Sequence, residues 1–478
     1  MPETAENCCG RIEEIACEDM ISALPDDLLV TILLSIPTKD AVATMILSKR
    51  WRFIWTMVPF LAYKEIDDDG DDGDDGGDFD DFDDLDDDVD SDDDDDDDDD
   101  EDEHDGDDDS KKSVWWFLNK SMEFHKAPVL AILSIKLGPQ CPTDANVGKL
   151  VESAINRIVW VLFFKLMWST DPTRMPNSLY TCKTLMHLKL SHKILVDPPS
   201  SSCLPSLTNL DLYYVVYKDE ASLGALLSSC PVLEFLCVKR KEDDNIATFS
   251  VKVPSLRFLS YRNYKSLPDN SDDVVDTSRS LIMDTPALRD FYITDRSGDS
   301  FAINNMSRLQ YAYVKVKYFP DKLLRSLSAV FSLELVLTDE MAVCCGTIKF
   351  CRLIKCKIVP RNSDWMESLV PLLRNTPKLK FLIVDYGSTC QPPNPSPSWR
   401  ESSSDPECLS SSLEEFEMIN YGGREEEEDL VAYILENSKC LKKATISFSP
   451  ELEDDETMID MFKAIPRVSV ASQLLFKT

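Results

Sequence analysis

One motif recurs along most of this 478-residue chain and limits the folds that the chain can adopt. It is Leu-x-x-Leu-x-Leu, with other apolar residues at some of the leucine positions. Six clear copies begin at Leu185, Leu207, Leu233, Leu256, Leu288 and Leu309. Three later copies begin at Leu379, Leu413 and Leu441. The first six begin 22, 26, 23, 32 and 21 residues apart, which is an irregular form of a leucine-rich repeat.

The motif predicts a solenoid, in which each copy contributes one strand and the residues between copies return as a helix or loop. The leucines of each strand point to one side, so stacked copies share one continuous core. Residues 220–230, with Leu223, Leu226 and Leu227, have the pattern of such a returning helix. We therefore predict an α/β chain whose main part is an irregular leucine-rich-repeat solenoid over residues 111–390.

Residues 391–406, which follow this solenoid, are rich in Pro and Ser. This composition is typical of a loop or linker. The final segment, residues 407–470, again has the order strand, helix, strand, with the two strands centred near Phe416 and Thr445. We expect it to form the last unit of the same architecture.

The residues that alternate with the motif leucines are expected to point away from the core and to line a concave sheet. Solenoids use such extended surfaces for binding. At every one of these positions the alternative is a side chain that contacts only solvent. We predict the following five as contacts of a bound protein: Lys189, Asp211, Ser260, Tyr292 and Tyr313.

The chain begins with residues 1–18, predicted to be flexible, and continues with residues 19–64, which predict three short helices. Pro25, followed by two aspartates, favours the start of the first helix, because proline fits the first turn and carboxylates interact well with the helix dipole. Thr38 and Ser48 can cap the second and third. So small a unit cannot bury all of its large apolar side chains. We expect some to contact another protein or, alternatively, the remainder of the same chain.

Residues 65–110, between these two parts, have a composition unlike either. Glu65 to Asp109 contains 33 acidic residues and no Lys or Arg, whereas the rest of the chain has 54 acidic and 50 basic residues. The formal net charge of −37 therefore comes almost wholly from this acidic tract. So dense a polyanion is predicted to be disordered. It acts either as a self-repelling spacer or as a site that captures basic proteins, and its glycines do not have the ligand spacing of a calcium-binding loop.

Other features of the composition argue against several functions. The 14 glycines form neither of the nucleotide-binding motifs, and the 15 cysteines form no Cys-x-x-Cys pair that would predict a zinc site. The sequence has no Lys/Arg-rich stripe of the kind that would predict nucleic-acid binding. The longest apolar run, residues 158–168, is too short to span a membrane. We predict no cofactor, no metal site, and neither nucleic acid nor membrane as a partner.

An enzyme is a further alternative. Its best candidates are His187 or His192 with Cys182 or Cys203, but the sequence places no acidic partner at a suitable spacing. We predict no catalytic residue. The acidic start of the chain lacks the pattern of a signal peptide, and an odd number of cysteines fits reduced thiols, so we expect a cytoplasmic or nuclear protein.

Several segments together resemble one protein family. Ile21 to Leu29, Ile36 to Val42 and Leu47 to Arg52 resemble the F-box of the plant F-box/leucine-rich-repeat/FBD family. The segments 177–185 and 230–234 are similar to its repeat signatures, and 413–416, 421–424 and 433–437 are similar to its C-terminal FBD segment. The resemblance covers most of the chain except the acidic tract.

This resemblance implies a function. It implies the substrate-recognition subunit of an SCF-type, cullin-based ubiquitin ligase, a receptor that catalyses nothing itself. The F-box docks on a Skp-type adaptor, and the repeats bind the unknown protein that is to be ubiquitinated. By motif position, the resemblance implies the following adaptor-facing or interface-supporting residues: Leu24, Pro25, Leu28, Leu29, Ile32, Val42, Leu47, Trp51 and Trp55.

The chain is alternatively a repeat scaffold outside any ligase, binding basic proteins through its acidic tract. Moreover, the tract directly follows the F-box, where relatives have a short connector. We expect this position to make the distance between adaptor and substrate platform variable, which matters for a mechanism based on proximity.

Overall fold

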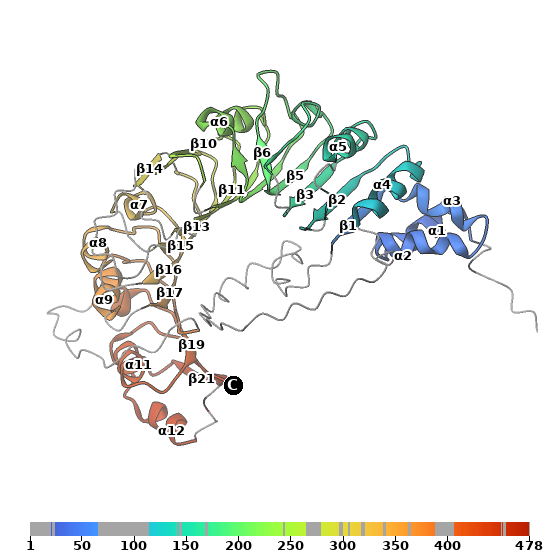
Figure 1. Cartoon of the computed structure of the whole chain (residues 1–478). Helices are drawn as coiled ribbons and strands as arrows, with labels where there is room; N and C mark the ends of the chain where they lie inside the picture. Colours follow the sequence, from blue (N-terminus) through green and yellow to red (C-terminus); the bar gives the residue numbers. More distant parts are fainter. Residues whose placement is uncertain are drawn as a thin grey trace, which may run out of the picture.

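The structure, a computed structural model, describes residues 21, 24–65, 114–139, 141–142, 146–167, 171–241, 244–263, 279–295, 300–304, 306–316, 321–337, 341–361, 365–387, 406–450, 452 and 456–477. The described residues form an arc (Figure 1). Strands of one long sheet line its inner side, and an N-terminal helical unit lies at one end. The acidic tract and the Pro/Ser-rich segment, apart from Glu65 and Pro406, lie outside the described residues.

The N-terminal unit consists of short helices joined by tight turns. They are α1 (Asp26–Leu33), α2 (Thr38–Ala43), η1 (Thr44–Ile46), α3 (Trp51–Ile54) and η2 (Trp55–Met57). As the sequence predicts, Pro25 stands before α1, and two aspartates occupy its first turn. The unit has a small core of its own, and the following residues form it: Leu29, Leu33, Ala41, Trp51, Ile54, Trp55 and Val58.

The long sheet has fifteen strands within the described residues, and every neighbouring pair is parallel. Its first eight strands are β1 (Phe60–Lys64), β2 (Ile132–Leu137), β3 (Val161–Leu166), β5 (His187–His192), β7 (Asn209–Tyr213), β9 (Phe235–Arg240), β11 (Phe258–Asn263) and β13 (Asp290–Asp295). The others are β15 (Tyr311–Val316), β16 (Ser332–Leu337), β17 (Lys355–Pro360), β18 (Phe381–Asp385), β19 (Glu415–Tyr421), β20 (Lys443–Phe448) and β21 (Gln473–Lys477). The predicted solenoid is thus confirmed.

The repeat motif explains how each strand is oriented. In β5, Leu188 and Leu190 are fully buried, whereas Lys189 between them is half-buried on the other face. Leu210 and Leu212 of β7 pair in register with these two leucines and are buried equally. Because most neighbouring strands repeat this alternation in register, the inward residues form one core that follows the arc.

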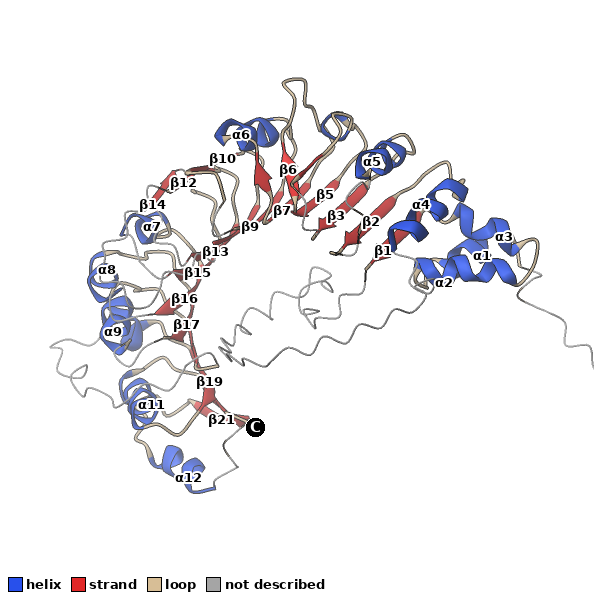
Figure 2. Cartoon of the chain, in the orientation of Figure 1, coloured by secondary structure: helices blue, strands red, loops and turns tan. Residues whose placement is uncertain are grey.

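Helices and two small sheets cover the outer side of the arc (Figure 2). The helices are α4 (Val114–Phe124), α5 (Val147–Ile155), α6 (Glu220–Ser228), α7 (Asp321–Ser326), α8 (Ala342–Thr347), α9 (Met366–Arg374), α10 (Glu407–Ser411), α11 (Glu425–Asn437) and α12 (Glu456–Ala464), with the 3-10 turn η3 (Leu179–Thr181). One small sheet contains β4 (Thr173–Arg174), β6 (Ile194–Val196) and β8 (Val216–Tyr217). The other contains β10 (Thr248–Lys252), β12 (Ser280–Asp284) and β14 (Ser300–Asn304). The predicted helix near residues 220–230 is α6.

The N-terminal unit is joined directly to the sheet. Its chain continues from η2 into β1, which pairs with β2, and the backbone N–H of Ala62 in β1 donates to the side-chain oxygen of Thr38 at 2.8 Å. Glu65, which the sequence groups with the acidic tract, is buried, and its carboxylate accepts a hydrogen bond from the backbone N–H of Gly138. The distance from the N-terminal unit to the sheet therefore does not depend on the acidic tract, contrary to the expectation from the sequence.

The segment that follows α4 returns to the same junction. The backbone N–H groups of Lys126 and Ala127 donate to the carbonyl of Thr56 at 2.9 and 2.8 Å. Beside them, the Nε2 atom of the His125 ring lies 2.8 Å from the carbonyl oxygen of Val58, and the Nδ1 atom lies 2.8 Å from a guanidinium nitrogen of Arg157. The acidic tract thus joins two elements, β1 and α4, that pack at one end of the arc.

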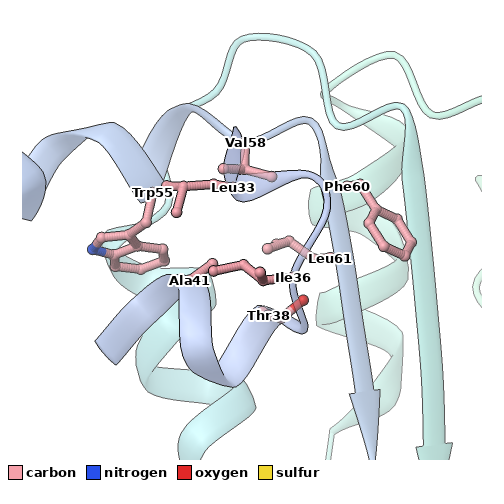
Figure 3. Close-up of a pocket in the computed structure, with 8 residues that line it drawn as sticks. All are labelled: Leu33, Ile36, Thr38, Ala41, Trp55, Val58, Phe60 and Leu61. Atoms are coloured by element: carbon pink, nitrogen blue, oxygen red, sulfur yellow. The ribbon is translucent and has the colours of Figure 1, made fainter. Parts of the chain in front are cut away.

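A small gap remains at this junction (Figure 3). Its volume is about 10 Å³, and its lining residues are Leu33, Ile36, Thr38, Ala41, Trp55, Val58, Phe60 and Leu61. A space of this size holds one water molecule at most, and an almost wholly apolar lining offers a water few partners. The gap is therefore a packing defect and not a binding site.

Candidate protein-interaction surfaces

The N-terminal unit exposes an unusual amount of apolar side-chain surface. Ile46, Leu47 and Phe53 expose 82%, 63% and 60% of their surface. The other large apolar residues exposed on this unit are Ile21, Leu28, Ile32, Leu34, Met45 and Met57. Exposed large apolar side chains gathered on one small unit favour an interface with a partner. This apolar surface is the first candidate site.

The residues predicted from the motif to face an adaptor divide by burial. Leu28, Ile32, Leu47 and Pro25 are exposed on the N-terminal unit, and Leu24 and Val42 are half-buried. Leu29, Trp51 and Trp55 are buried, with 0%, 5% and 4% of their surface exposed. Within this chain the buried three hold the helices together and offer almost no surface for a partner. An adaptor contact by the exposed residues stays a prediction.

The sequence prediction missed six exposed apolar residues of this unit: Ile21, Leu34, Met45, Ile46, Phe53 and Met57. Periodicity could not separate them from core residues, because these short helices carry apolar side chains on two faces. In α1, for example, Leu29 and Leu33 point inward while Leu28 and Ile32 point outward. Only the packing of the three helices decides which face is left uncovered.

The second candidate site is the concave face of the sheet. The five predicted contacts lie in one register row across neighbouring strands, and these pairings define it: Lys189 with Asp211, Asp211 with Cys237, Cys237 with Ser260, Ser260 with Tyr292, and Tyr292 with Tyr313. Ser260 and Tyr313 expose only 8% and 4% of their surface, whereas Lys189, Asp211 and Tyr292 are half-buried. The structure brings the five residues together, and their contact with a substrate stays a prediction.

Aromatic rings gather in the middle of this face. The Tyr292 ring lies 5.3 Å from that of Phe258, 5.1 Å from Tyr311 and 6.2 Å from Tyr313, measured between centroids. Burial raises the pKa of Tyr292 to about 12, and the nearby carboxylates of Asp290 and Glu334 add to the increase. Aromatic residues such as these supply much of the energy in protein interfaces. The sequence prediction named one outward residue in each of five repeats, and it missed Phe258 and Tyr311, which contact the Tyr292 ring.

Charged residues adjoin the aromatic group in a linked chain. The Tyr311 hydroxyl donates to Glu334 at 2.8 Å, and the Lys357 ammonium lies 3.0 Å from Glu334 and 3.3 Å from Asp385. Burial alone lowers the pKa of Lys357, but the two carboxylates outweigh burial and raise it above its ordinary value. These groups are fixed by one another and so present a rigid pattern of charge.

The structure gives His187 an acidic partner, although none was expected from the sequence. Its Nε2 atom lies 2.6 Å from a carboxylate oxygen of Asp211 on the next strand, an acidic partner that sequence spacing does not reveal. Its ring also packs edge-on against Phe163, with 4.7 Å between centroids. Cys182, one of the two candidate nucleophiles, is buried and contacts the hydroxyl of Thr184 instead. His187 and Cys182 therefore contact other groups and do not form a nucleophile with its base.

No group of three or more His, Cys, Asp or Glu side chains is arranged in the described part of the chain to hold a metal ion. None of the described helices has both the length and the apolar composition for crossing a bilayer.

Comparison with known families and proteins agrees with this architecture. The F-box domain family matches residues 21–63. The family described as the LRR repeats of the FBD-associated F-box protein At5g56370 matches residues 149–312, and the FBD family matches residues 400–446. The chain is 50% identical to the Arabidopsis thaliana FBD-associated F-box protein At1g05080, over 98% of this chain and 99% of the relative.

Two further relatives from Arabidopsis thaliana are similar over nearly their whole length. The F-box/FBD/LRR-repeat protein At1g22000 is 43% identical over 100% of this chain and 94% of its own. The F-box/FBD/LRR-repeat protein At4g26340 is 35% identical over 96% of this chain and 100% of its own. Full-length similarity of this degree, together with the helical unit and the repeat sheet, establishes that the chain belongs to the plant F-box/FBD/LRR-repeat family.

Proposed function

We propose that this protein is the substrate-recognition subunit of an SCF-type ubiquitin ligase. Its F-box binds a Skp-type adaptor, which connects it to a cullin, and its concave face binds the protein to be ubiquitinated. The observation that carries the proposal is the exposed apolar surface of the F-box around Ile46, Leu47 and Phe53, because a surface of this kind is stabilised by a partner. Membership of a family of generally non-catalytic adaptors supports it.

The fixed junction between the F-box and the sheet fits such a role. A receptor accelerates modification by holding a substrate near the activated ubiquitin, which requires a defined distance between its two binding surfaces. Here, hydrogen bonds from Ala62 to Thr38 and from Lys126 to Thr56 join the two parts without involving the acidic tract. The receptor therefore works as one rigid body, with the concave face at a set distance from the adaptor.

Adaptor binding is tested with a double substitution, Leu28→Asp and Ile46→Asp. Both side chains are exposed, with 50% and 82% of their surface accessible, so the variant should fold. We expect adaptor affinity to fall by at least about 30-fold, because interface hot spots contribute about 2 kcal/mol or more. The matched control is Val343→Asp, which changes an apolar residue with 76% exposure on α8. Equal affinity in the double variant and in the control would refute this interface.

The alternative is a scaffold outside any ligase. Co-purification separates the two: a ligase receptor brings down adaptor and cullin together, whereas a scaffold does not bring down the cullin. Substrates are then identified by comparing the wild type with the Leu28→Asp/Ile46→Asp variant while the proteasome is blocked. Substrates are the proteins that bind both forms. Once the block is removed, they are degraded in cells with the wild type but not in cells with the variant. The double variant is preferable to removing the F-box, because deleting the chain up to residue 63 also deletes most of β1.

A further inference from the structure

A second register row on the concave face is basic. It runs through the position two residues after the row of predicted contacts, and its successive pairings are Lys64 with Lys136, Lys136 with Lys165, Lys165 with Ser191, Ser191 with Tyr213, Tyr213 with Lys239, Lys239 with Arg262, Arg262 with Thr294, and Thr294 with Lys315. Six of these nine positions are Lys or Arg, and none is acidic. We call Lys64, Lys136, Lys165, Lys239, Arg262 and Lys315 the basic row.

The row is formed by folding and not by an excess of basic residues. Outside the acidic tract the chain has 54 acidic and 50 basic residues, and members of the row from different repeats stand far apart in sequence. Neighbouring strands are about 4.8 Å apart, so side chains in register on adjacent strands stand side by side. Like charges placed in this way repel one another, and an anion bound along the row lowers this repulsion.

The neighbouring residues add to the positive charge. The ammonium groups of Lys189 and Lys239 both lie 4.8 Å from the centre of the Tyr213 ring, so that one ring holds two cations together. Asp211, the acidic residue nearest to them in register, is already paired with His187 at 2.6 Å. A concave surface with this charge concentrates the electric field and attracts a polyanion.

We propose that the basic row binds a polyanionic polypeptide, and that its occupant is the chain's own segment of residues 66–109. This segment contains every acidic residue of the tract except Glu65, 32 in all, and no Lys or Arg. It begins two residues after Lys64, the first member of the row, and the chain returns at α4, which contacts β1. Both ends of the segment are therefore attached at the same end of the row.

The length of the segment fits this assignment. From β1 to β15 the row crosses nine strands, a span of roughly 40 Å at about 4.8 Å for each of the eight intervals. An extended half of the 48 residues between Glu65 and Val114 reaches about 80 Å. The segment is thus long enough to follow the row and return. Its covalent attachment also gives it an effective concentration in the millimolar range, which an acidic partner in solution rarely matches.

The test uses a synthetic peptide of residues 66–109 and two forms of the full chain. One form is the wild type, and in the other an equally long Gly/Ser sequence replaces residues 66–109. We expect the peptide to bind the Gly/Ser form at least about tenfold more tightly than the wild type, because the tethered segment competes. Binding should also be lost at about 1 M salt, where charges are screened beyond about 3 Å. Equal affinity for the two forms would overturn the assignment of the occupant.

A second comparison tests the site. In the Gly/Ser form, Lys64→Gln, Lys165→Gln and Lys239→Gln together should weaken peptide binding by about tenfold or more, through loss of three attractive charges. The matched control replaces Lys252, Lys322 and Lys439 by Gln, which removes the same charge from exposed positions outside the basic row. Equal weakening in both triple variants would refute the basic row as the site. Melting temperatures within a few degrees of the parent show that both variants are folded.

Direct evidence comes from the unmodified protein. A carbodiimide joins a lysine to a carboxylate only when the two are in contact. We expect cross-links from residues 66–109 of the wild type to Lys64, Lys165 and Lys239 in preference to Lys252 and Lys322, as identified by mass spectrometry. An even distribution of cross-links over all lysines would contradict the proposal.

Discussion

At the scale of single residues, His125 illustrates how an ionisable side chain can serve as a structural joint. Its ring accepts at Nδ1 from Arg157 and therefore carries its proton on Nε2, which donates to the Val58 carbonyl. Burial lowers its pKa from 6.5 to about 4, and the Arg157 charge acts in the same direction, whereas the Val58 hydrogen bond opposes them. The neutral ring thus joins the end of the F-box to the first repeat.

This arrangement predicts how stability depends on pH. The folded form takes up the His125 proton only near pH 4, whereas the unfolded chain does so near pH 6.5, so the contribution is complete above pH 6.5 and is lost as the pH falls toward 4. We expect wild type to lose about 2 to 3 kcal/mol more than His125→Gln over this interval. Urea unfolding of both proteins at several pH values measures the difference. Parallel curves for the two proteins would contradict the assigned role.

Leu28 and Leu29 are adjacent in sequence yet differ in role. Leu29 is fully buried in the F-box core, whereas Leu28 exposes half of its surface. Leu29→Ala should therefore destabilise the protein by about 2 to 5 kcal/mol, because it leaves a cavity. Leu28→Ala should change stability by less than about 0.5 kcal/mol and reduce only adaptor affinity. Thermal unfolding and titration with the adaptor distinguish the two, and a similar loss of stability in both variants would be inconsistent with the structure.

At the scale of elements, the sequence predicts the repeats where leucine occupies the motif and misses others. All nine motif copies correspond to strands of the long sheet, from β5 to β20. By contrast, β16 and β17 are absent from the prediction, because their motifs are Val330-x-x-Leu333-x-Leu335 and Leu353-x-x-Cys356-x-Ile358. Any apolar side chain of suitable volume fills these inward positions, so a search for leucine underestimates the number of repeats.

The position of β1 could not be predicted for a different reason. Phe60 to Lys64 is a short segment next to the F-box helices, and the acidic tract separates it from the strand with which it pairs. Pairing across such a distance leaves no local pattern. The basic row was hidden in the same way, because a linear search for a basic stripe cannot find side chains that only the register of the sheet aligns.

The junction predicts that the F-box and the first repeats unfold together. Leu33 is buried in the F-box core, and Leu33→Ala should cost about 2 to 5 kcal/mol. In a repeat protein such a loss spreads mainly to neighbouring units. We expect faster hydrogen exchange in α1, β1 and β2 and unchanged exchange in β19 and β20, measured by mass spectrometry. Faster exchange confined to the helices would show that the F-box is an independent module.

At the scale of the whole molecule, the arc fixes where its two interaction surfaces lie relative to each other (Figure 1). The helices of the F-box continue the arc beyond β1, and the concave face follows on the inner side of the sheet. Family membership and the repeat fold could be predicted from sequence motifs. The fixed relation between the two surfaces could not, because it depends on hydrogen bonds such as that from Ala62 to Thr38.

This geometry predicts that the acidic tract has no part in adaptor binding. Replacing residues 66–109 by an equally long Gly/Ser sequence leaves the exposed F-box surface and its joint with β1 unchanged. We expect adaptor affinity, measured by calorimetry at physiological salt, to stay within about twofold of the wild-type value. A larger change would show that the segment reaches the adaptor. The same variant is used in the peptide experiment. Adaptor binding and binding of the acidic segment are therefore measured separately in one protein.

The contact between Thr38 and β1 has a further consequence, which concerns how the family evolves. The first strand of an open sheet exposes an edge of backbone groups that invites aggregation, and α2 of the F-box lies against that edge. The F-box is therefore also the N-terminal cap of the solenoid. A descendant that no longer binds an adaptor would still be selected to keep its helices, and only the loss of exposed residues such as Ile46 and Phe53 would record the change.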